Sequence, residues 1–409
     1  MTSDVSDRSP ERARRALAPL YLAGFTTAFG AHGVASVLGA ESEDVGLSLL
    51  GLGVALALYD LAEVVLKPFF GALSDRIGPK PVIVGGLVAF AGVSLVAVIH
   101  PSSIMLALVR LGQGAAASAF SPASSSAVAR IAGRERLGRL FGRYGGWKSL
   151  GYVLGPVIGV ALAHFVGLRA VYVALAVPAA VAAIWSARVL PRLPVAPRAR
   201  FTVADLVRQT RERGFLIPTI VLATSTGILG VAVGFIPLLA TRHDLHPVAG
   251  AAAVALLALT SAASQPVIGR LRDEGRVNTA TGSGAGLLLS AAALLLLAVT
   301  PGTAALFVAA AAIGLTIGIV TPLAFAHLAA VTPDERMGRT MGNAELGREL
   351  GDAGGPLLVG AIASAATLAA GLTALAAVSA AAGAVGWLGL RPRPTRPPRS
   401  TAPGRTPRR

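Results

Sequence analysis

The chain has 409 residues, of which 54% are hydrophobic and 14% charged, with a mean hydropathy of +0.68 and a formal net charge of +16. Soluble proteins carry about 25% charged residues, so this composition predicts a polytopic membrane protein rather than two or three soluble domains. The absence of cysteine excludes disulfides, thiolate metal sites and a cysteine nucleophile.

Apolar stretches long enough to cross a membrane, which takes about 20 residues, recur along the whole chain. We predict twelve spans, near residues 17–39, 47–70, 81–100, 103–130, 141–164, 169–189, 215–240, 248–268, 279–299, 303–330, 343–367 and 370–390. A polar and basic segment, residues 1–16, precedes the first span, and no cleavable signal peptide is evident. The fold class is therefore all-α and membrane-spanning.

Arginine and lysine gather in alternate connections between the spans. The residues after the second, fourth, sixth, eighth and tenth spans are basic, whereas the opposite side holds only Arg169 and Arg242 and an acidic first loop, "GAESEDVG". By the positive-inside rule both termini are cytoplasmic. We expect the membrane to be a bacterial plasma membrane. The same rule accounts for the net charge without nucleic-acid binding. We expect the Pro- and Arg-rich tail 391–409 to be disordered and at most to touch anionic lipid.

An internal repeat divides the chain. Residues 134–156 ("RERLGRLFGRYGGWKSLGYVLGP") and 334–356 ("DERMGRTMGNAELGRELGDAGGP") share nine identities at an ungapped offset of 200. "GALSD" at 71–75 likewise matches "GRLRD" at 269–273. The repeat predicts two six-helix bundles, residues 17–189 and 215–390, joined by a cytoplasmic linker at 190–214 and related by pseudo-symmetry.

The stretch "GALSDRIGPK" at 71–80 is polar between two apolar spans. Gly71 permits close helix approach, and Gly78 permits a tight turn with positive φ. Asp75 is suited to face a helix N-terminus, where the macrodipole favours an anion. Two further stretches stand out, "RLGQG" at 110–114 and "GYVLGPVIG" at 151–159.

These three stretches resemble signature motifs of the major facilitator superfamily. The first is similar to the latch between helices 2 and 3, through Gly71, Asp75, Arg76, Gly78 and Lys80, with Pro79 departing from the pattern. The second resembles the fourth-helix motif through Arg110, Gln113 and Gly114, and the third the helix-5 motif of exporters through Gly151, Gly155, Pro156 and Gly159. The resemblance implies a twelve-helix transporter similar to drug:proton antiporters. It also implies that the latch joins the two halves on the cytoplasmic side.

Charged residues inside the predicted spans are costly and therefore mark function. Candidates for proton coupling or gating are Asp60, Glu63, Arg110, Arg348 and Asp352, and candidates for the substrate cavity are His32, Arg110 and Gln113. Asp60 and Glu63 fall at a depth similar to that of Arg348, with which either acid would pair when the halves close. Alternatively, Glu63 and Lys67, spaced i,i+4, neutralise each other, and Lys148 only snorkels.

The predicted function is secondary active transport across the plasma membrane. We expect proton-coupled efflux of small organic or drug-like compounds by alternating access; the alternative is a proton-coupled symporter that imports a small nutrient or anion. No acid, base and nucleophile cluster predicts an enzyme, and no phosphate-binding loop predicts an ATP-driven pump. No cofactor, metal or nucleic acid is expected. The expected partners are substrate, protons and lipid, and the expected state is monomeric.

Overall fold

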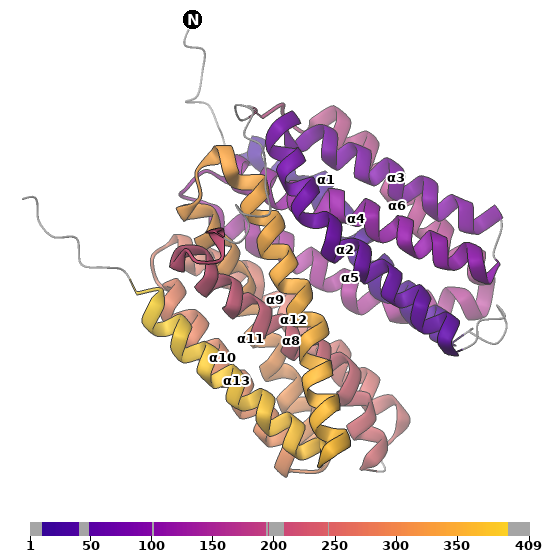
Figure 1. The fold of residues 1–409 in the computed structure, drawn as a ribbon, viewed down its shortest axis with the longest axis vertical. Coiled ribbons are helices and arrows are strands. Elements are labelled where there is room, and N and C mark those ends of the chain that lie inside the picture. Colours follow the sequence, from indigo (N-terminus) through magenta and orange to yellow (C-terminus); the bar gives the residue numbers. More distant parts are fainter. Residues whose placement is uncertain are drawn as a thin grey trace, which may run out of the picture.

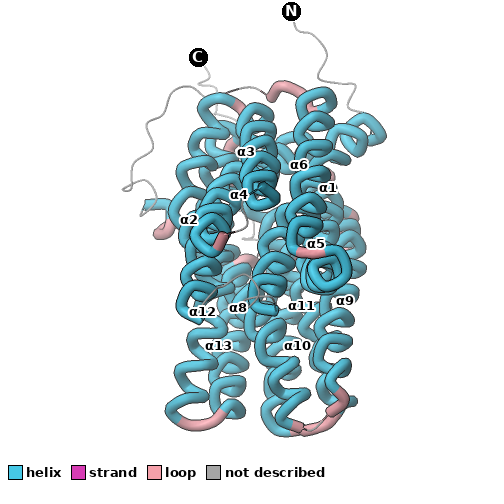
Figure 2. Tube along the Cα trace, turned by 90° about the vertical axis from the view of Figure 1, so that its right-hand side faces the viewer, coloured by secondary structure: helices cyan, strands magenta, loops and turns pink. Residues whose placement is uncertain are grey.

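A computed structural model of the chain describes residues 10–40, 49–99, 102–193, 195, 208–243 and 245–391. The helices, labelled as in Figure 1, are α1 (Pro10–Ala40), α2 (Leu49–Ile77), α3 (Pro79–Ile99), α4 (Ser103–Ala132), α5 (Leu137–Val166), α6 (Leu168–Val189), α8 (Arg213–Arg242), α9 (Pro247–Asp273), α10 (Thr279–Val299), α11 (Thr303–Val331), α12 (Met337–Ala365) and α13 (Leu368–Gly389), with a short 3₁₀ turn at Asp334–Arg336. No strand occurs among these residues (Figure 2). The acidic first loop, most of the linker and of segment 1–16, and all but the first residue of the tail lie outside the described residues.

Each predicted span corresponds to one long helix, but several helices extend beyond the apolar stretch. The helix α2 continues to Ile77, so most of "GALSDRIGPK" is helical and only Gly78 lies between α2 and α3. Likewise α5 begins at Leu137 and α12 at Met337, before their predicted starts. The apolar pattern predicts the part of each helix that lies in lipid, whereas backbone hydrogen bonding continues beyond that part.

The helices form two groups with the same packing pattern (Figure 1). In the first group α1 packs on α5, α2 on α4, and α3 on α6 and α4. In the second group α8 packs on α12, α9 on α11, and α10 on α13 and α11. Each pair in one group therefore has its counterpart in the other, as the sequence repeat predicts.

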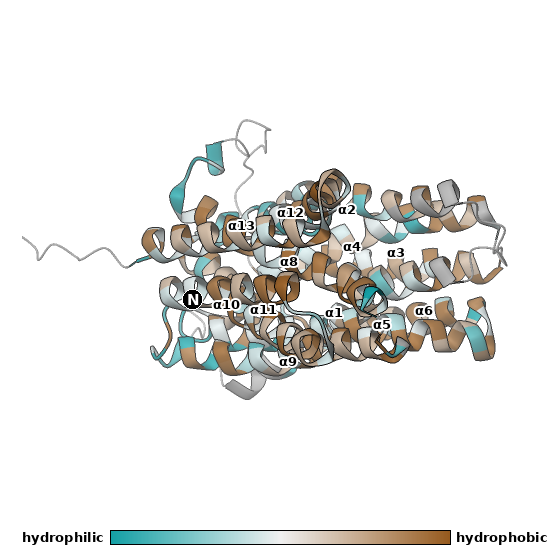
Figure 3. Cartoon of the chain, turned by 90° about the horizontal axis from the view of Figure 1, so that it is seen from below, coloured by the Kyte–Doolittle hydropathy of each residue, from teal (hydrophilic) through white to brown (hydrophobic). Residues whose placement is uncertain are grey.

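The outer faces of the bundle are apolar. Large exposed side chains include Val88 on α3, Val177 on α6, Leu288 on α10 and Val378 on α13, and hydrophilic residues gather mainly at the helix ends (Figure 3). Nine of the twelve described helices are long and apolar enough to cross a membrane by length and composition; the others are α1, α2 and α12. The exposed apolar surface is what a bilayer requires. Both α2 and α12 carry the charged residues of the site described below.

The two groups meet along a seam formed by α2 against α12 and α5 against α9 (Figure 2). The arginine-rich helix ends, which include Arg76, Arg134, Arg272 and Arg336, lie at one end of this seam, called here the basic face. Toward the opposite end the two groups diverge (Figure 1), and among the described residues α1 and α8 make no comparably extensive contact. The seam is thus closed at the basic face.

Candidate functional site

The carboxylate of Asp75 closes the seam at the basic face. It accepts hydrogen bonds from the backbone N–H groups of Gly338 (2.6 Å) and Arg339 (2.8 Å), the second and third residues of α12. These N–H groups have no partner inside the helix, and the helix dipole favours an anion there. A Cβ on Gly71 would lie 2.5 Å from the carbonyl oxygen of Gly338, so a larger residue would push the helices apart. The structure places Asp75 where the motif predicts.

The other latch residues shape the turn that follows. Gly78 has φ of +89°, a conformation that favours glycine. Lys80 donates a hydrogen bond to the carbonyl oxygen of Leu190 at 2.7 Å, at the end of α6. Arg76 is exposed beside them. Asp75 and Gly71 therefore join the two groups, whereas Gly78 and Lys80 hold the turn within the first group.

A second carboxylate makes the same contact on the other side of the seam. Asp273, at the end of α9, accepts hydrogen bonds from the N–H groups of Gly138 (2.8 Å) and Arg139 (2.7 Å), at the start of α5. Gly138 and Gly269 pack backbone to backbone beside it. We call the contacts of Asp75 and Asp273 the two clasps. Asp273 was not among the predicted site residues. The match of "GALSD" with "GRLRD" nevertheless indicates it, because Asp273 occupies the place of Asp75.

Charged side chains fill the middle of the seam. Lys67 on α2 is fully buried and bridges the two groups, because its Nζ lies 3.1 Å from Glu63 Oε2 and 2.6 Å from Glu349 Oε1. Arg348 donates to Glu345 (3.0 Å) and Glu349 (2.6 Å), and also to the Tyr152 hydroxyl (3.1 Å) on α5. Arg348 thus pairs with acids of its own helix, rather than with Asp60 or Glu63 as the sequence interpretation expected.

Lys148 belongs to this network as well. Its Nζ lies 3.9 Å from Glu345 Oε1 and 3.4 Å from the Ser121 hydroxyl, and its side chain is 12% exposed. The alternative that Lys148 only snorkels is therefore wrong. The i,i+4 pairing of Glu63 with Lys67 is present, but Lys67 contacts Glu349 at a shorter distance.

Asp60 and Asp352 differ from the other acids of the seam. Among the described residues neither makes an ion pair, Asp60 is exposed and Asp352 is half-buried. Both lie within electrostatic range of the paired network, through its Glu349 and its Lys67. Each helix group thus contributes one acid without an ion pair, Asp60 from α2 and Asp352 from α12, and these two helices pack on each other.

The three candidate residues for the substrate cavity, His32, Arg110 and Gln113, lie in different surroundings. The ring of His32 lies edge-on to that of Tyr152, with 4.6 Å between centroids, beside a small cavity between the groups. Arg110 is buried, donates to the carbonyl oxygens of Gly30 and Ala31, and lies over the Tyr59 ring. Gln113 is fully buried and donates to Ser94. Of the three, His32 lines a cavity between the groups, whereas the contacts of Arg110 and Gln113 lie within the first helix group.

The helix-5 motif packs α5 against α1. Cβ atoms placed on Gly151 and Gly155 would meet the backbone of Phe25 and Phe29, and one on Gly159 would lie 3.2 Å from the carbonyl oxygen of Gly33. Pro156 lies within α5. The glycines thus remove the side chains that would separate these two helices.

Two small cavities lie between the helix groups, one of about 50 Å³ and one of about 20 Å³. They share Ser149, Tyr152 and Leu229, so Tyr152 stands between them. Lys148, Glu345 and Arg348 line the larger one, and His32 lines the smaller. The larger has room for a few water molecules. Any solute held here would contact both helix groups at once.

Removal of the bridging lysine should be the most destabilising change in the network. Lys67→Met leaves Glu63 and Glu349 buried without their shared cation, and breaking a buried pair in this way costs about 3–5 kcal/mol. We expect a clear loss of stability in thermal unfolding of the purified protein. Arg270→Met, which breaks the exposed pair with Glu274, is the control and should change little. Equal stability of the two variants would contradict a bridging role.

Two groups of six long helices, joined by one seam and covered with apolar side chains, define a multi-pass membrane protein with a transporter-like architecture. The sequence profile of the Major Facilitator Superfamily matches residues 20–304 and 253–409. The chain belongs to this superfamily, whose members are transporters and not enzymes.

Known relatives match a part of the chain. The Escherichia coli inner membrane transport protein YajR is 36% identical over 140 residues, which is 32% of this chain and 30% of YajR. The Staphylococcus aureus quinolone resistance protein NorA is 29% identical over 145 residues, 36% of this chain and 37% of NorA. Each match thus spans about a third of the relative's length.

Solved structures match nearly the whole chain. The human organic anion transporter MFSD10 superposes with a TM-score of 0.78 at 19% identity, covering 92% of this chain and 100% of that one. The E. coli fucose:proton symporter FucP gives 0.75 at 13% identity, covering 92% and 98%. At such identities the likeness concerns the fold alone, and it confirms the predicted all-α, twelve-helix architecture.

Proposed function

We propose that this transporter is a proton-coupled exporter of small organic or drug-like compounds in a bacterial plasma membrane. Its basic face lies in the cytoplasm, and it works by alternating access at the seam. The observation that carries the proposal is that α2 and α12 hold both a clasp and the unpaired acids Asp60 and Asp352. Movement of these two helices therefore alters the surroundings of a proton-binding group.

Two observations support efflux rather than uptake. The glycine and proline motif of α5 resembles that of exporters, and the similarity to NorA points toward efflux of drug-like compounds. The orientation rests on the arginines of the basic face, which the positive-inside rule assigns to the cytoplasm. Symport of a nutrient or anion with protons is the second candidate, and the fold shared with FucP is compatible with it.

Everted membrane vesicles distinguish the two candidates. In these vesicles the basic face is turned outward, and respiration acidifies the interior. A resistance profile of cells that express the protein first selects the compounds to be added. An antiporter exchanges internal protons for an added substrate, so the pH gradient collapses in proportion to transport. A symporter leaves the gradient intact under these conditions, and that result would overturn the assignment as an exporter. Vesicles without the protein are the control.

A further inference from the structure

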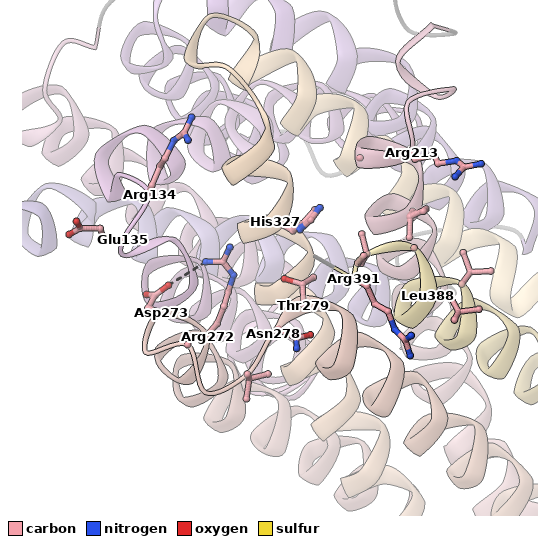
Figure 4. A pocket seen from close by; sticks show the side chains of 17 residues that line it. Arg134, Glu135, Arg213, Arg272, Asp273, Asn278, Thr279, His327, Leu388 and Arg391 are labelled. Atoms are coloured by element: carbon pink, nitrogen blue, oxygen red, sulfur yellow. Dashed lines mark hydrogen bonds and ion pairs between the residues drawn. The ribbon is translucent and has the colours of Figure 1, made fainter. Parts of the chain in front are cut away.

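A large cavity opens at the basic face, apart from the buried charges of Lys67, Glu345, Arg348 and Glu349. Its volume is about 1320 Å³, and its walls come from the ends of α8, α9, α10, α11 and α13 and from the connection after α4. Figure 4 shows Arg213, Arg391 and Leu388 on one side and Arg134 and Arg272 on the other, with His327 and Thr279 between them. Of its lining residues, the proposed transport cycle uses Asp273, which forms the second clasp.

The cavity carries an excess of positive charge. Four arginines line it, namely Arg134, Arg213, Arg272 and Arg391, against two acids, Glu135 and Asp273. Asp273 pairs with Arg272 at 3.4 Å, so the excess over Glu135 comes from Arg134, Arg213 and Arg391. The starts of α8 and α10 also lie on the wall, and the dipoles of both helices favour an anion. The cavity is therefore suited to a negatively charged group.

Two of the arginines are held in place before any ligand binds. The guanidinium of Arg391 lies over the Trp387 ring at 4.7 Å, which is within cation–π range. Arg272 donates to Asp273 at 3.4 Å and to the carbonyl oxygen of Ala326 at 3.3 Å. Side chains already fixed by such contacts lose less conformational entropy when they bind a ligand.

One edge of the same cavity is apolar and faces outward. Val385 and Leu388 of α13 line it and are 44% and 65% exposed. They belong to the outer helices whose exposed apolar side chains face lipid. A soluble anion gains nothing from such an edge, whereas an acyl chain would cover it. The combination favours a ligand with a charged head and an apolar tail.

We propose that this cavity binds an anionic phospholipid of the leaflet at the basic face. Its phosphate lies among Arg213, Arg272 and Arg391, and an acyl chain runs along Val385 and Leu388. Basic pockets between membrane helices on this side bind anionic head groups by the same electrostatics. Since Arg272 also pairs with Asp273, the bound lipid contacts the second clasp and links its strength to lipid composition.

Lipid binding to the purified full-length protein tests the proposal. Native mass spectrometry and thermal unfolding would be measured with phosphatidylglycerol, phosphatidylcholine or inorganic phosphate added. We expect retention of one phosphatidylglycerol and a raised unfolding temperature, and no such effect of phosphatidylcholine. The double variant Arg213→Ala/Arg391→Ala should weaken phosphatidylglycerol binding roughly thirty-fold, since each arginine near an anionic lipid contributes about a five-fold factor. Both side chains are exposed, so the variant should fold.

The matched control removes the same charge from the same face outside the cavity. Arg188→Ala/Arg211→Ala, two exposed residues that do not line the cavity, should bind phosphatidylglycerol like the unmodified protein. Equal losses in the two double variants would show non-specific attraction and overturn the proposal. Stabilisation by inorganic phosphate alone, without preference for phosphatidylglycerol, would overturn it in favour of a free-phosphate site. Equal binding of phosphatidylcholine would overturn it as well.

Discussion

Replacement of the two unpaired acids should abolish uphill transport while the protein still exchanges substrate downhill. In Asp60→Asn/Asp352→Asn we expect concentrative efflux to fall to the level of vesicles that lack the protein. Downhill exchange should remain and lose its dependence on pH. The measurement is transport of a substrate identified by resistance profiling, with and without an imposed pH gradient, at matched expression.

The physical reason is that an amide has no proton to bind or release. A carboxyl group that is hydrated in one state and buried in another binds its proton more tightly in the buried state. Asp60 and Asp352 lie on the two helices that must separate when the seam opens, and among the described residues neither has a cation paired to it. Their proton affinity can therefore follow the movement, which is the differential interaction that a population shift requires.

Glu63→Gln is the matched control, because it removes a carboxylate one helical turn away on the same helix. Glu63 is paired with Lys67 at 3.1 Å, so its loss should lower stability and leave proton coupling intact. From the sequence, Asp60 and Glu63 are equal candidates for proton coupling. The ion pair of Glu63 with Lys67 leaves Asp60 as the candidate on α2. If the double variant still concentrates substrate with normal pH dependence, neither aspartate carries the proton, and His32 becomes the next residue to replace.

Much of this architecture could be predicted from the sequence because membrane spans and repeats leave local signals. The twelve spans follow from runs of apolar residues, and the clasp of Asp75 follows from a short motif next to a glycine. The second clasp was equally visible, since Asp273 occupies in "GRLRD" the place of Asp75 in "GALSD". The repeat counts helices, and it also transfers the role of Asp75 to Asp273 once the two stretches are aligned residue by residue.

The pairing of the buried charges could not be predicted in this way. Lys67 has Glu63 one turn away, a local partner that sequence spacing identifies, whereas Glu349 is 282 residues distant and becomes a partner only when α2 packs on α12. Arg348 has acids three residues before it and one residue after it, and it uses both. Gln113 is a cavity candidate from the sequence, but in the structure its side chain donates to Ser94 on α3. These outcomes depend on helix rotation and packing.

Loss of both clasps should reverse the side from which the seam is accessible. Each carboxylate accepts two charge-assisted hydrogen bonds at a helix start, and together these contribute about 1–2 kcal/mol per clasp. Asp75→Asn/Asp273→Asn should therefore shift the equilibrium toward the state open at the basic face by roughly thirty-fold or more. Each single variant should give a similar, smaller shift, because the two clasps have nearly equal distances, 2.6 and 2.8 Å against 2.8 and 2.7 Å.

The chain itself provides a clean measurement, because it contains no cysteine. A cysteine introduced at Ser149, which lines both central cavities, reports access from either side through its reaction with a membrane-impermeant maleimide. In the otherwise unmodified protein we expect labelling from the side opposite the basic face. In the double clasp variant the label should enter from the basic face, as seen by comparing everted with right-side-out vesicles.

The control for this experiment is Asp334→Asn. Asp334 is exposed in the 3₁₀ turn, three residues before α12 begins. The substitution therefore removes one negative charge near the first clasp and leaves the clasp contacts of Asp75 in place. It should label like the unmodified protein. If the double clasp variant does so too, the clasps do not hold the seam shut. The buried bridge of Lys67 to Glu349 would then be the contact that keeps the basic face closed, and Lys67→Met should produce the reversal instead.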